Sequence, residues 1–179
     1  VLVKILKSEL GEMAADLVHT GLTSQDVVDT ALVLTLKDVI HILTDRLTAL
    51  DKGLADIQSR FGASKLAAYT RMQPALTTPA KQIIGRWRQP ISRLIDDGMH
   101  LTGALGIIQW GGSIGTRDHP QANKLAALFA KNLDLKDPGE SWHTDRTIIY
   151  DAGHLMTRTT TMTGKIGEDA ALMAAIGPE

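Results

Sequence analysis

The sequence predicts an all-α protein built as a bundle of long helices. Aromatic residues make up only 4% of the 179 residues, whereas hydrophobic residues make up 44%. Apolar residues also recur at steps of three and four over long stretches, which is the period of one helix face. The clearest stretch runs from Gln25 to Phe61. Its apolar stripe consists of Leu32, Leu36, Val39, Leu43, Leu47, Leu50, Leu54, Ile57 and Phe61.

The helix expected over Gln25 to Phe61 has recognisable ends. Thr23 or Ser24 precedes it and can act as the N-cap, and Gly62 follows it at the position where helices often stop. At about 1.5 Å per residue such a helix is on the order of 55 Å long. A small globule cannot cover a helix of that length, so we expect other long helices beside it.

Further helical segments follow from the same periodicity. We expect helices from residue 1 to about 18, from Pro79 to about Gln109, from Gln121 to Leu133 and from Thr144 to Ile176. Pro90 lies inside the second of these and should kink it or remove a hydrogen bond. We expect no strands, and residues 63–77 are predicted to form a long irregular connection. Loops of that length inside a bundle are often functional.

Composition and charge exclude several classes of protein. Nineteen Lys and Arg residues balance 20 Asp and Glu residues, which argues against a nucleic-acid surface or a polybasic membrane anchor. The chain has no cysteine, so disulfides, thiolate catalysis and Cys-ligated metals are excluded, and a reducing compartment fits. No apolar run approaches the roughly 18 residues that span a bilayer. We therefore expect a cytoplasmic protein that binds neither nucleic acid nor membrane.

Four polar stretches interrupt the helical pattern, namely His19–Asp26, Thr70–Pro74, Gln109–Thr116 and Trp142–Arg146. The first can bind a carboxylate or phosphate, because free N–H groups and two hydroxyls meet at the start of a helix, or it can be a plain N-cap turn. The glycine-rich third stretch can equally be a helix C-cap. In the fourth, Thr144 can simply be an N-cap. Spacing alone leaves these alternatives open.

The four stretches, in this order, resemble the fumarase/aspartase superfamily. Residues 21–32, which read Gly-Leu-Thr-Ser-Gln-Asp-Val-Val-Asp-Thr-Ala-Leu, resemble its first signature region, and residues 68–78 resemble the second. Residues 111–116 and 142–146 are similar to the later regions, and they look most like bacterial 3-carboxy-cis,cis-muconate cycloisomerases. The resemblance covers essentially the whole chain and implies the long-helix bundle of the superfamily's central domain.

One departure from the superfamily pattern helps to choose a branch. Arg71 stands where the lyases place a catalytic histidine, between Thr70 and Gln73 of the second region. An arginine cannot exchange protons near neutral pH, but it can grip a carboxylate with two hydrogen bonds. The cycloisomerase branch tolerates replacement of that histidine, whereas adenylosuccinate lyase chemistry would be hard to run with Arg71.

The resemblance implies roles for individual residues. It makes His143 the acid/base candidate and gives substrate binding to His19, Thr23, Ser24, Arg71, Gln73 and Arg146. It implies a polycarboxylate substrate in protocatechuate degradation, no cofactor and no metal. It also implies a homotetramer whose active sites take residues from three subunits.

The resemblance also bears on domain organisation. The start of the superfamily's N-terminal domain, its serine-bearing loop and its C-terminal domain do not occur within residues 1–179. We therefore expect a partial central helical domain that is inactive by itself. Two rival functions remain: a lyase that releases fumarate from adenylosuccinate or argininosuccinate, and a non-catalytic helical oligomerisation module.

Overall fold

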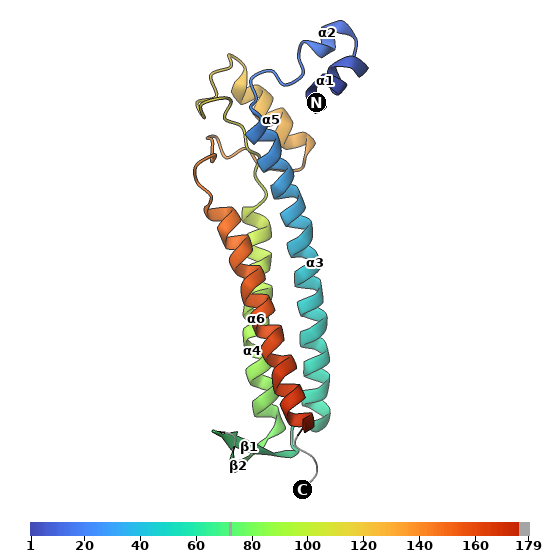
Figure 1. Ribbon diagram of the computed structural model, residues 1–179, viewed down its shortest axis with the longest axis vertical. Coiled ribbons are helices and arrows are strands. Elements are labelled where there is room, and N and C mark those ends of the chain that lie inside the picture. The colour runs from blue at the N-terminus through green and yellow to red at the C-terminus, as the bar shows by residue number, and fades with distance from the viewer. Residues whose placement is uncertain (72, 176–179) are drawn as a thin grey trace. The chain divides into compact units, whose positions relative to one another are not determined.

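The computed structural model describes residues 1–71 and 73–175 (Figure 1). Its elements in chain order are α1 (Leu2–Glu9), α2 (Glu12–Ala15), α3 (Ser24–Phe61), β1 (Lys65–Thr70), β2 (Gln73–Pro79), α4 (Ala80–Ala104), α5 (Ala122–Asn132) and α6 (Thr147–Ala175). The predicted helical bundle is confirmed, and the predicted end of the last helix, Ile176, lies outside the described residues. The chain divides into two compact units, which are described separately.

Two helix predictions need correction. The helix expected over residues 1–18 is broken into α1 and α2, because Leu10 and Gly11 both adopt an extended backbone with ψ of 149° and 154°. The helix expected to reach Gln109 ends at Ala104. Beyond that end the backbone bonds with a distant segment instead: Gly106 accepts a hydrogen bond from the Lys136 N–H, and the Ile108 N–H donates to Lys136. Pro90 lies within α4, as predicted.

The expectation of an irregular, strand-free connection over residues 63–77 is wrong. Strands β1 and β2 form an antiparallel hairpin in which Lys65 pairs with Pro79 and Thr70 with Gln73. Most residues of the hairpin are exposed, so the alternation of apolar and polar residues that marks a half-buried strand is missing. Pro74 also argues against a strand in the sequence, yet proline is tolerated where a strand lies at the edge of its sheet.

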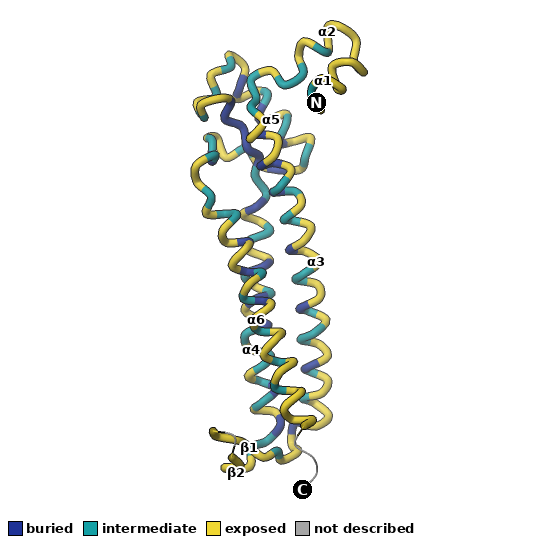
Figure 2. The backbone as a smooth tube through the Cα atoms, viewed as in Figure 1, coloured by how far each residue is buried: buried dark blue, intermediate teal, exposed yellow. Residues whose placement is uncertain are grey.

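One unit comprises Asp38–Gly103 together with the chain from Ile149 onward, and we call it the bundle unit. Within it the corresponding part of α3 runs beside α4 and α6 (Figure 1), and buried positions recur along these helices between exposed ones (Figure 2). Its buried apolar residues are Ile40, Leu47 and Leu54 of α3, Ala80, Ile84, Ile91 and Leu94 of α4, and Ala152 and Leu155 of α6. The hairpin belongs to this unit.

The three helices approach closely at Gly98. A Cβ atom built on this residue would lie 2.5 Å from Thr44 Oγ1 of α3, 3.7 Å from Leu155 Cδ2 of α6 and 3.8 Å from Ile40 Cγ2. Because the first distance is shorter than a non-bonded contact allows, a glycine is required for this crossing.

The buried line of α3 differs from the predicted stripe. The buried apolar residues are Val33, Ile40, Leu47 and Leu54, at steps of seven. Leu47 and Leu54 were predicted, but Val39, Ile57 and Phe61 remain 40–48% exposed. The helix carries apolar residues on two adjacent faces, and a repeat of threes and fours fits either face equally well. The remaining members of the predicted stripe, Leu32, Leu36, Leu43 and Leu50, are half-buried by the described residues.

The other unit comprises Val1–Lys37 and Ala104–Ile148, and we call it the loop unit. Its core consists of Ile108, Trp110, Leu135 and, on α5, Ala126 and Ala130, with Leu22 and Leu34 packed against them. Trp110 meets Phe129 edge to face, with ring centroids 5.9 Å apart. Every residue of α1 and α2 remains at least partly exposed. The unit also contains three of the four polar stretches, namely His19–Asp26, Gln109–Thr116 and Trp142–Arg146.

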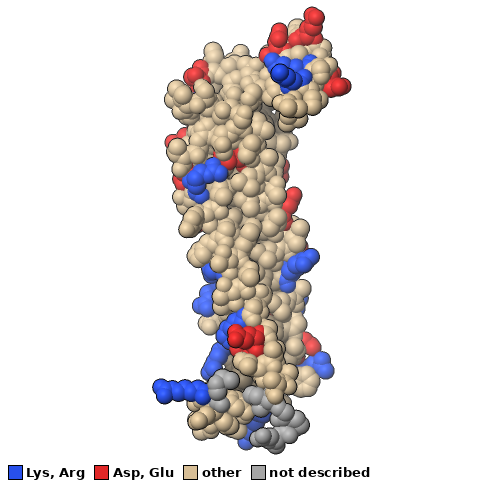
Figure 3. All heavy atoms as spheres, viewed as in Figure 1, with Lys and Arg blue, Asp and Glu red and all other residues tan. Residues whose placement is uncertain are grey.

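Surface chemistry agrees with the composition. On the face in view in Figure 3 the described basic and acidic side chains are scattered, not gathered into one field of a single sign. Among the described residues, each helix is too short or too polar to cross a bilayer.

Candidate functional site

The first turn of α3 buries a carboxylate that ties three segments together. Asp26 is fully buried. Its Oδ1 accepts hydrogen bonds from the Gly111 N–H at 2.8 Å and from Gln109 Nε2 at 3.3 Å, and it lies 2.8 Å from His143 Nε2. Its Oδ2 accepts from the N–H groups of Thr23 at 2.9 Å and Gly112 at 3.0 Å. The first, third and fourth polar stretches therefore converge on a single side chain.

Gln109 makes a second connection among the same segments. Its backbone N–H donates to Thr30 Oγ1 of α3 at 2.9 Å, its Nε2 donates to Ser141 Oγ at 2.8 Å, and its Oε1 accepts the Trp142 N–H at 2.9 Å. The side chain is fully buried and its amide is satisfied on both sides. A buried amide with both ends bonded fixes the position of each segment that it contacts.

A second carboxylate, three residues after Asp26, holds Arg146. Asp29 is 1% exposed and accepts both Arg146 Nη1 at 2.7 Å and Nη2 at 3.0 Å. The guanidinium also lies 5.4 Å from the Trp142 ring centroid, a distance typical of a cation–π contact. Asp26 and Asp29 on one helix turn thus face His143 and Arg146, which have the same spacing in the sequence.

Electrostatics keep the Asp29–Arg146 pair charged. Burial by itself would raise the pKa of Asp29, but hydrogen bonds from Arg146 and Gln25, together with the Arg146 charge, hold this pKa below its ordinary value. The hydrogen bond from Asp29 in turn raises the pKa of Arg146. Two of the five N–H donors of Arg146 are used in this pair. Among the described residues, the other three donors have no hydrogen-bond partner.

The turn that enters α3 presents the predicted anion-binding residues. Because α3 begins at Ser24, Thr23 occupies the N-cap position. His19 and Thr23 are half-buried and Ser24 is exposed. His19 has a φ of 69° and Gly21 a φ of 70°, and a Cβ on Gly21 would lie 3.0 Å from His119 Cβ. The tight turn therefore brings His19, Thr23 and Ser24 into the unit that also contains His143 and Arg146.

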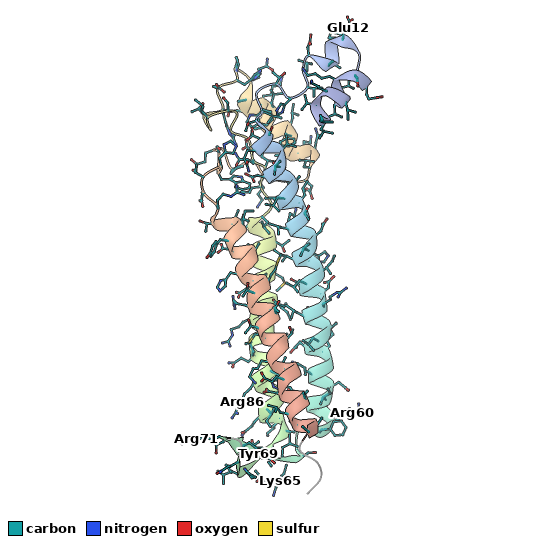
Figure 4. The ribbon with its side chains drawn as sticks, viewed as in Figure 1. Glu12, Arg60, Lys65, Tyr69, Arg71 and Arg86 are labelled. Carbon is teal, nitrogen blue, oxygen red and sulfur yellow. The ribbon has the colours of Figure 1, made fainter. Side chains whose placement is uncertain are left out.

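Arg71 and Gln73 belong to the bundle unit. Arg71 lies in the two-residue connection between Thr70 and Gln73, and its side chain projects from the tip of the hairpin, beyond Tyr69 and Lys65 of β1 (Figure 4). Its φ is 50°, in the left-handed region that costs a residue with a Cβ atom about 1–2 kcal/mol. Arginine is an unusual choice at such a turn. Backbone strain of this kind is a reason to look for a functional role.

The sequence prediction missed the residues that organise the site. Asp26, Asp29, Gln109 and Ser141 lie inside or beside the quoted motifs but received no role. One signal was present: Asp26 is seven residues before Val33 and therefore continues the buried series of α3. A charged residue in a buried register predicts a buried partner. In addition, Asp145 rather than Thr144 accepts the hydrogen bond from the Thr147 N–H at the start of α6.

Within residues 1–71 and 73–175, no cluster of three or more His, Asp or Glu side chains is arranged to hold a metal ion. The chemistry available at the site is that of a histidine, an arginine, hydroxyl groups and the free N–H groups of a helix start. Such groups bind carboxylates and move protons.

Comparison with known proteins identifies the family. A sequence model described as Lyase matches residues 2–177. The chain belongs to the lyase family of the fumarase/aspartase superfamily. The 3-carboxy-cis,cis-muconate cycloisomerase of Bradyrhizobium diazoefficiens is 33% identical over 96% of this chain and 39% of its own length. The Pseudomonas aeruginosa protein of the same name is 31% identical over 87% of this chain and 34% of its own length.

A solved structure agrees with the sequence relatives of this lyase-family chain. The β-carboxy-cis,cis-muconate cycloisomerase from Acinetobacter calcoaceticus matches with a TM-score of 0.90 and 26% identity, over 96% of this chain and 41% of the other. The 179 residues thus span roughly two fifths of the length of these relatives. The predicted superfamily and its long-helix bundle are confirmed.

Proposed function

We propose that the chain is the central helical part of a cycloisomerase that interconverts a tricarboxylate muconate and its lactone. The proposal rests first on the site, where the Thr23–Ser24 turn and His143 are held around the single carboxylate of Asp26. Such a site offers anion binding beside a proton-transfer group. The similarity to cycloisomerases at 33% and 31% identity supports this reaction among those of the family.

The proposed chemistry adds a substrate carboxylate across a double bond while a proton moves to the adjacent carbon. His143 is the acid/base, and Thr23 and Ser24 bind a substrate carboxylate with His19 beside them. Arg71 and Gln73 contact a second carboxylate. Arg146 binds a further anionic group through the donors that Asp29 leaves free. The reaction as proposed needs no cofactor and no metal, and it belongs to protocatechuate degradation in the cytoplasm.

An assay with carboxymuconate tests the reaction. Loss of the diene absorbance is followed with this 179-residue chain and with a longer protein that carries it together with the serine loop and the C-terminal domain. We expect turnover only from the longer protein. Release of fumarate from adenylosuccinate or argininosuccinate would instead move the protein into the lyase branch. An inactive longer protein with a degraded serine loop would support a non-catalytic module.

Variants of Arg71 test its role as a substrate ligand. Losing a charged hydrogen bond in a desolvated site costs about 2–4 kcal/mol, or roughly 30- to 1000-fold in kcat/KM. We expect Arg71→Ala to show this loss and Arg71→Lys to recover little of it. The ammonium of lysine is a point charge and cannot make the two parallel hydrogen bonds of a guanidinium. We also expect Arg71→His to be less active and to release no fumarate. Full activity in Arg71→Lys would exclude a bidentate hydrogen bond between Arg71 and a substrate carboxylate.

The exposed apolar face of α3 supports the proposal that the chain assembles with copies of itself. Val39, Ile57 and Phe61 on this face are 40–48% exposed in the single chain. We expect sedimentation equilibrium to give about four times the 19.3 kDa chain mass, or at least a dimer. Ile57→Glu should weaken this assembly, whereas Ser59→Glu, which adds the same charge off the stripe, should not. A monomer at tens of micromolar, on the order of normal assay concentrations, would contradict the proposal.

A further inference from the structure

The hydrogen bonds around Asp26 define its chemical state. Five nitrogen atoms surround its two oxygens at 2.8–3.3 Å, and the side chain is fully buried. Four of these nitrogens can only donate a hydrogen bond. They are the backbone nitrogens of Thr23, Gly111 and Gly112 and the amide nitrogen of Gln109. A carboxylate has about four lone-pair sites. Each oxygen is therefore occupied as an acceptor, and the group has no room for a proton of its own.

This state of Asp26 determines which nitrogen of His143 carries a hydrogen. His143 Nε2 lies 2.8 Å from Asp26 Oδ1. Since the oxygen is an acceptor only, Nε2 must donate. In the neutral imidazole one nitrogen carries the hydrogen and the other is bare, so Nδ1 is left as the free acceptor.

Glycines make room around the ring. A Cβ on Gly111 would lie 2.8 Å from His143 Cε1, and a Cβ on Gly115 would lie 4.0 Å from Nδ1. The His143 side chain is 18% exposed, whereas Asp26 is completely covered. The Nε2 edge thus meets a fully covered carboxylate, while Gly111 and Gly115, which have no side chains, lie beside the Cε1–Nδ1 edge.

We propose that Asp26 is a positioning residue that holds His143 in its Nε2–H form and leaves Nδ1 as the nitrogen that exchanges a proton with the substrate. The proposal rests on the proposed function in one respect, namely that His143 is the acid/base. In the cyclising direction Nδ1 first takes a proton from water, which makes the ring cationic, and then passes that proton to the substrate carbon as the carboxylate oxygen forms its bond to the neighbouring carbon. In the reverse direction Nδ1 takes that proton back as the carbon–oxygen bond breaks. Nε2 keeps its hydrogen on Asp26 throughout.

Asp29 offers a matched control for Asp26. It lies three residues later on the same face of α3 and is equally buried, but it binds Arg146 and not His143. The charged groups that the structure relates to the imidazole are Asp26, which contacts Nε2, and Asp29, which binds Arg146 of the His143 segment. Asp26→Asn and Asp29→Asn therefore remove the same charge from neighbouring positions, and only the first changes the group that faces Nε2, where the amide keeps a single acceptor oxygen for five nitrogens.

The decisive measurement is the tautomer of His143 in this chain. The protein is labelled with ¹⁵N in its histidine rings, and the His143 signals are assigned by their loss in His143→Gln. We expect the Nε2 shift of a protonated nitrogen and the Nδ1 shift of a bare one at neutral pH. Asp26→Asn should give a mixture of tautomers, and Asp29→Asn should leave the wild-type pattern. If Asp26→Asn fails to fold, the tautomer of His143 in the wild type alone decides whether Asp26 has the positioning role. A hydrogen on Nδ1, or a wild-type mixture, would overturn the positioning role.

Kinetics in the longer enzyme separate this proposal from the proposed function. Proton transfer by a positioned group contributes about 100- to 10,000-fold, so Asp26→Asn should lower kcat by about 100-fold or more with KM within a few-fold. Asp29→Asn acts through Arg146 and should raise KM instead. A His143→Gln variant that keeps kcat within about two-fold would refute the acid/base role of His143, whereas the tautomer measurement would still judge the part played by Asp26.

Discussion

The loop unit and the bundle unit are held together in different ways, although one helix contributes to both. In the loop unit the first turns of α3 bury Asp26, Asp29 and Thr30, and each is bonded to a segment more than 75 residues away. In the bundle unit the same helix buries Ile40, Leu47 and Leu54. Directional bonds fix a constellation of side chains, whereas apolar contacts depend mainly on area and volume.

This contrast separates two kinds of burial along one helix. Polar groups buried in the loop unit are costly unless they are fully paired, so their arrangement tolerates little change. Apolar residues of the bundle unit tolerate substitutions that keep volume. Variants in each of the two units test these two kinds of interaction.

The largest expected effect comes from removing the Asp26 carboxylate. Asp26→Ala leaves five donors without their acceptor, three of them in fully buried hydrogen bonds, and an unsatisfied buried group costs about 1–3 kcal/mol. We expect the free energy of unfolding to fall by about 4 kcal/mol or more, measured by urea denaturation. Asp38→Ala, at an exposed position of the same helix, should change it by less than about 0.5 kcal/mol. A loss in Asp26→Ala as small as that of the control would show that the network adds little to stability.

The next largest loss of stability is expected when a substitution creates a cavity in the bundle unit. Ile40→Ala should cost about 3 kcal/mol, because Ile40 is fully buried and its removal leaves a void between α3, α4 and α6. Ile42→Ala is the matched control, since it makes the same change on a residue that is 54% exposed. Equal losses in the two variants would mean that the buried line of α3 has been assigned to the wrong face.

Acid should weaken the loop unit through Asp29. Its pKa is lowered in the folded protein, so its contribution to stability is complete above the unfolded value of about 3.9 and is lost as pH falls through the folded value. Asp29→Asn should cost about 2 kcal/mol at pH 7, because the partner Arg146 is partly exposed and keeps some hydration. The stability difference between the variant and the wild type should begin to narrow as the pH falls below about 4 and should close below the folded pKa of Asp29. A gap that stays constant down to pH 2 would contradict the charged pair.

The sequence predicted the fold more fully than the site, for a physical reason. Helix position follows from local periodicity, which is why α3, α4, α5 and α6 were found within a few residues. The hairpin was missed because its strands, exposed on both faces, carry no alternation. The choice between two apolar faces on α3 depends on tertiary contacts, as do the pairings of Asp26 with His143 and Asp29 with Arg146, which join residues 117 positions apart.

A smaller effect is expected where α3 and α4 cross. Gly98→Ala places a methyl group 2.5 Å from Thr44 Oγ1, and overpacking of this kind typically costs about 1–3 kcal/mol. Gly53→Ala, which meets nothing within 4 Å, should stabilise α3 by up to about 1 kcal/mol. The double variant Gly98→Ala with Thr44→Ala should recover part of the loss. Thermal melts of the four proteins, including wild type, would show opposite shifts for the two single glycine variants.

The smallest expected change in stability concerns the strained backbone of Arg71, a predicted substrate ligand in the bundle unit. Arg71 has a φ of 50°, a conformation that asparagine tolerates better than other residues with a Cβ atom. We expect Arg71→Asn to stabilise the hairpin by up to about 1 kcal/mol, seen as slower hydrogen exchange at the Thr70 and Gln73 amides. Arg71→Ala has the same loss of charge without the relief of strain, so its exchange should not slow.

Because both variants lose the guanidinium, both should bind substrate weakly in the longer enzyme. A gain of stability together with a loss of binding in Arg71→Asn would mean that the turn keeps arginine for its ligand and not for the fold. No gain in stability would remove strain as an argument for the function of Arg71.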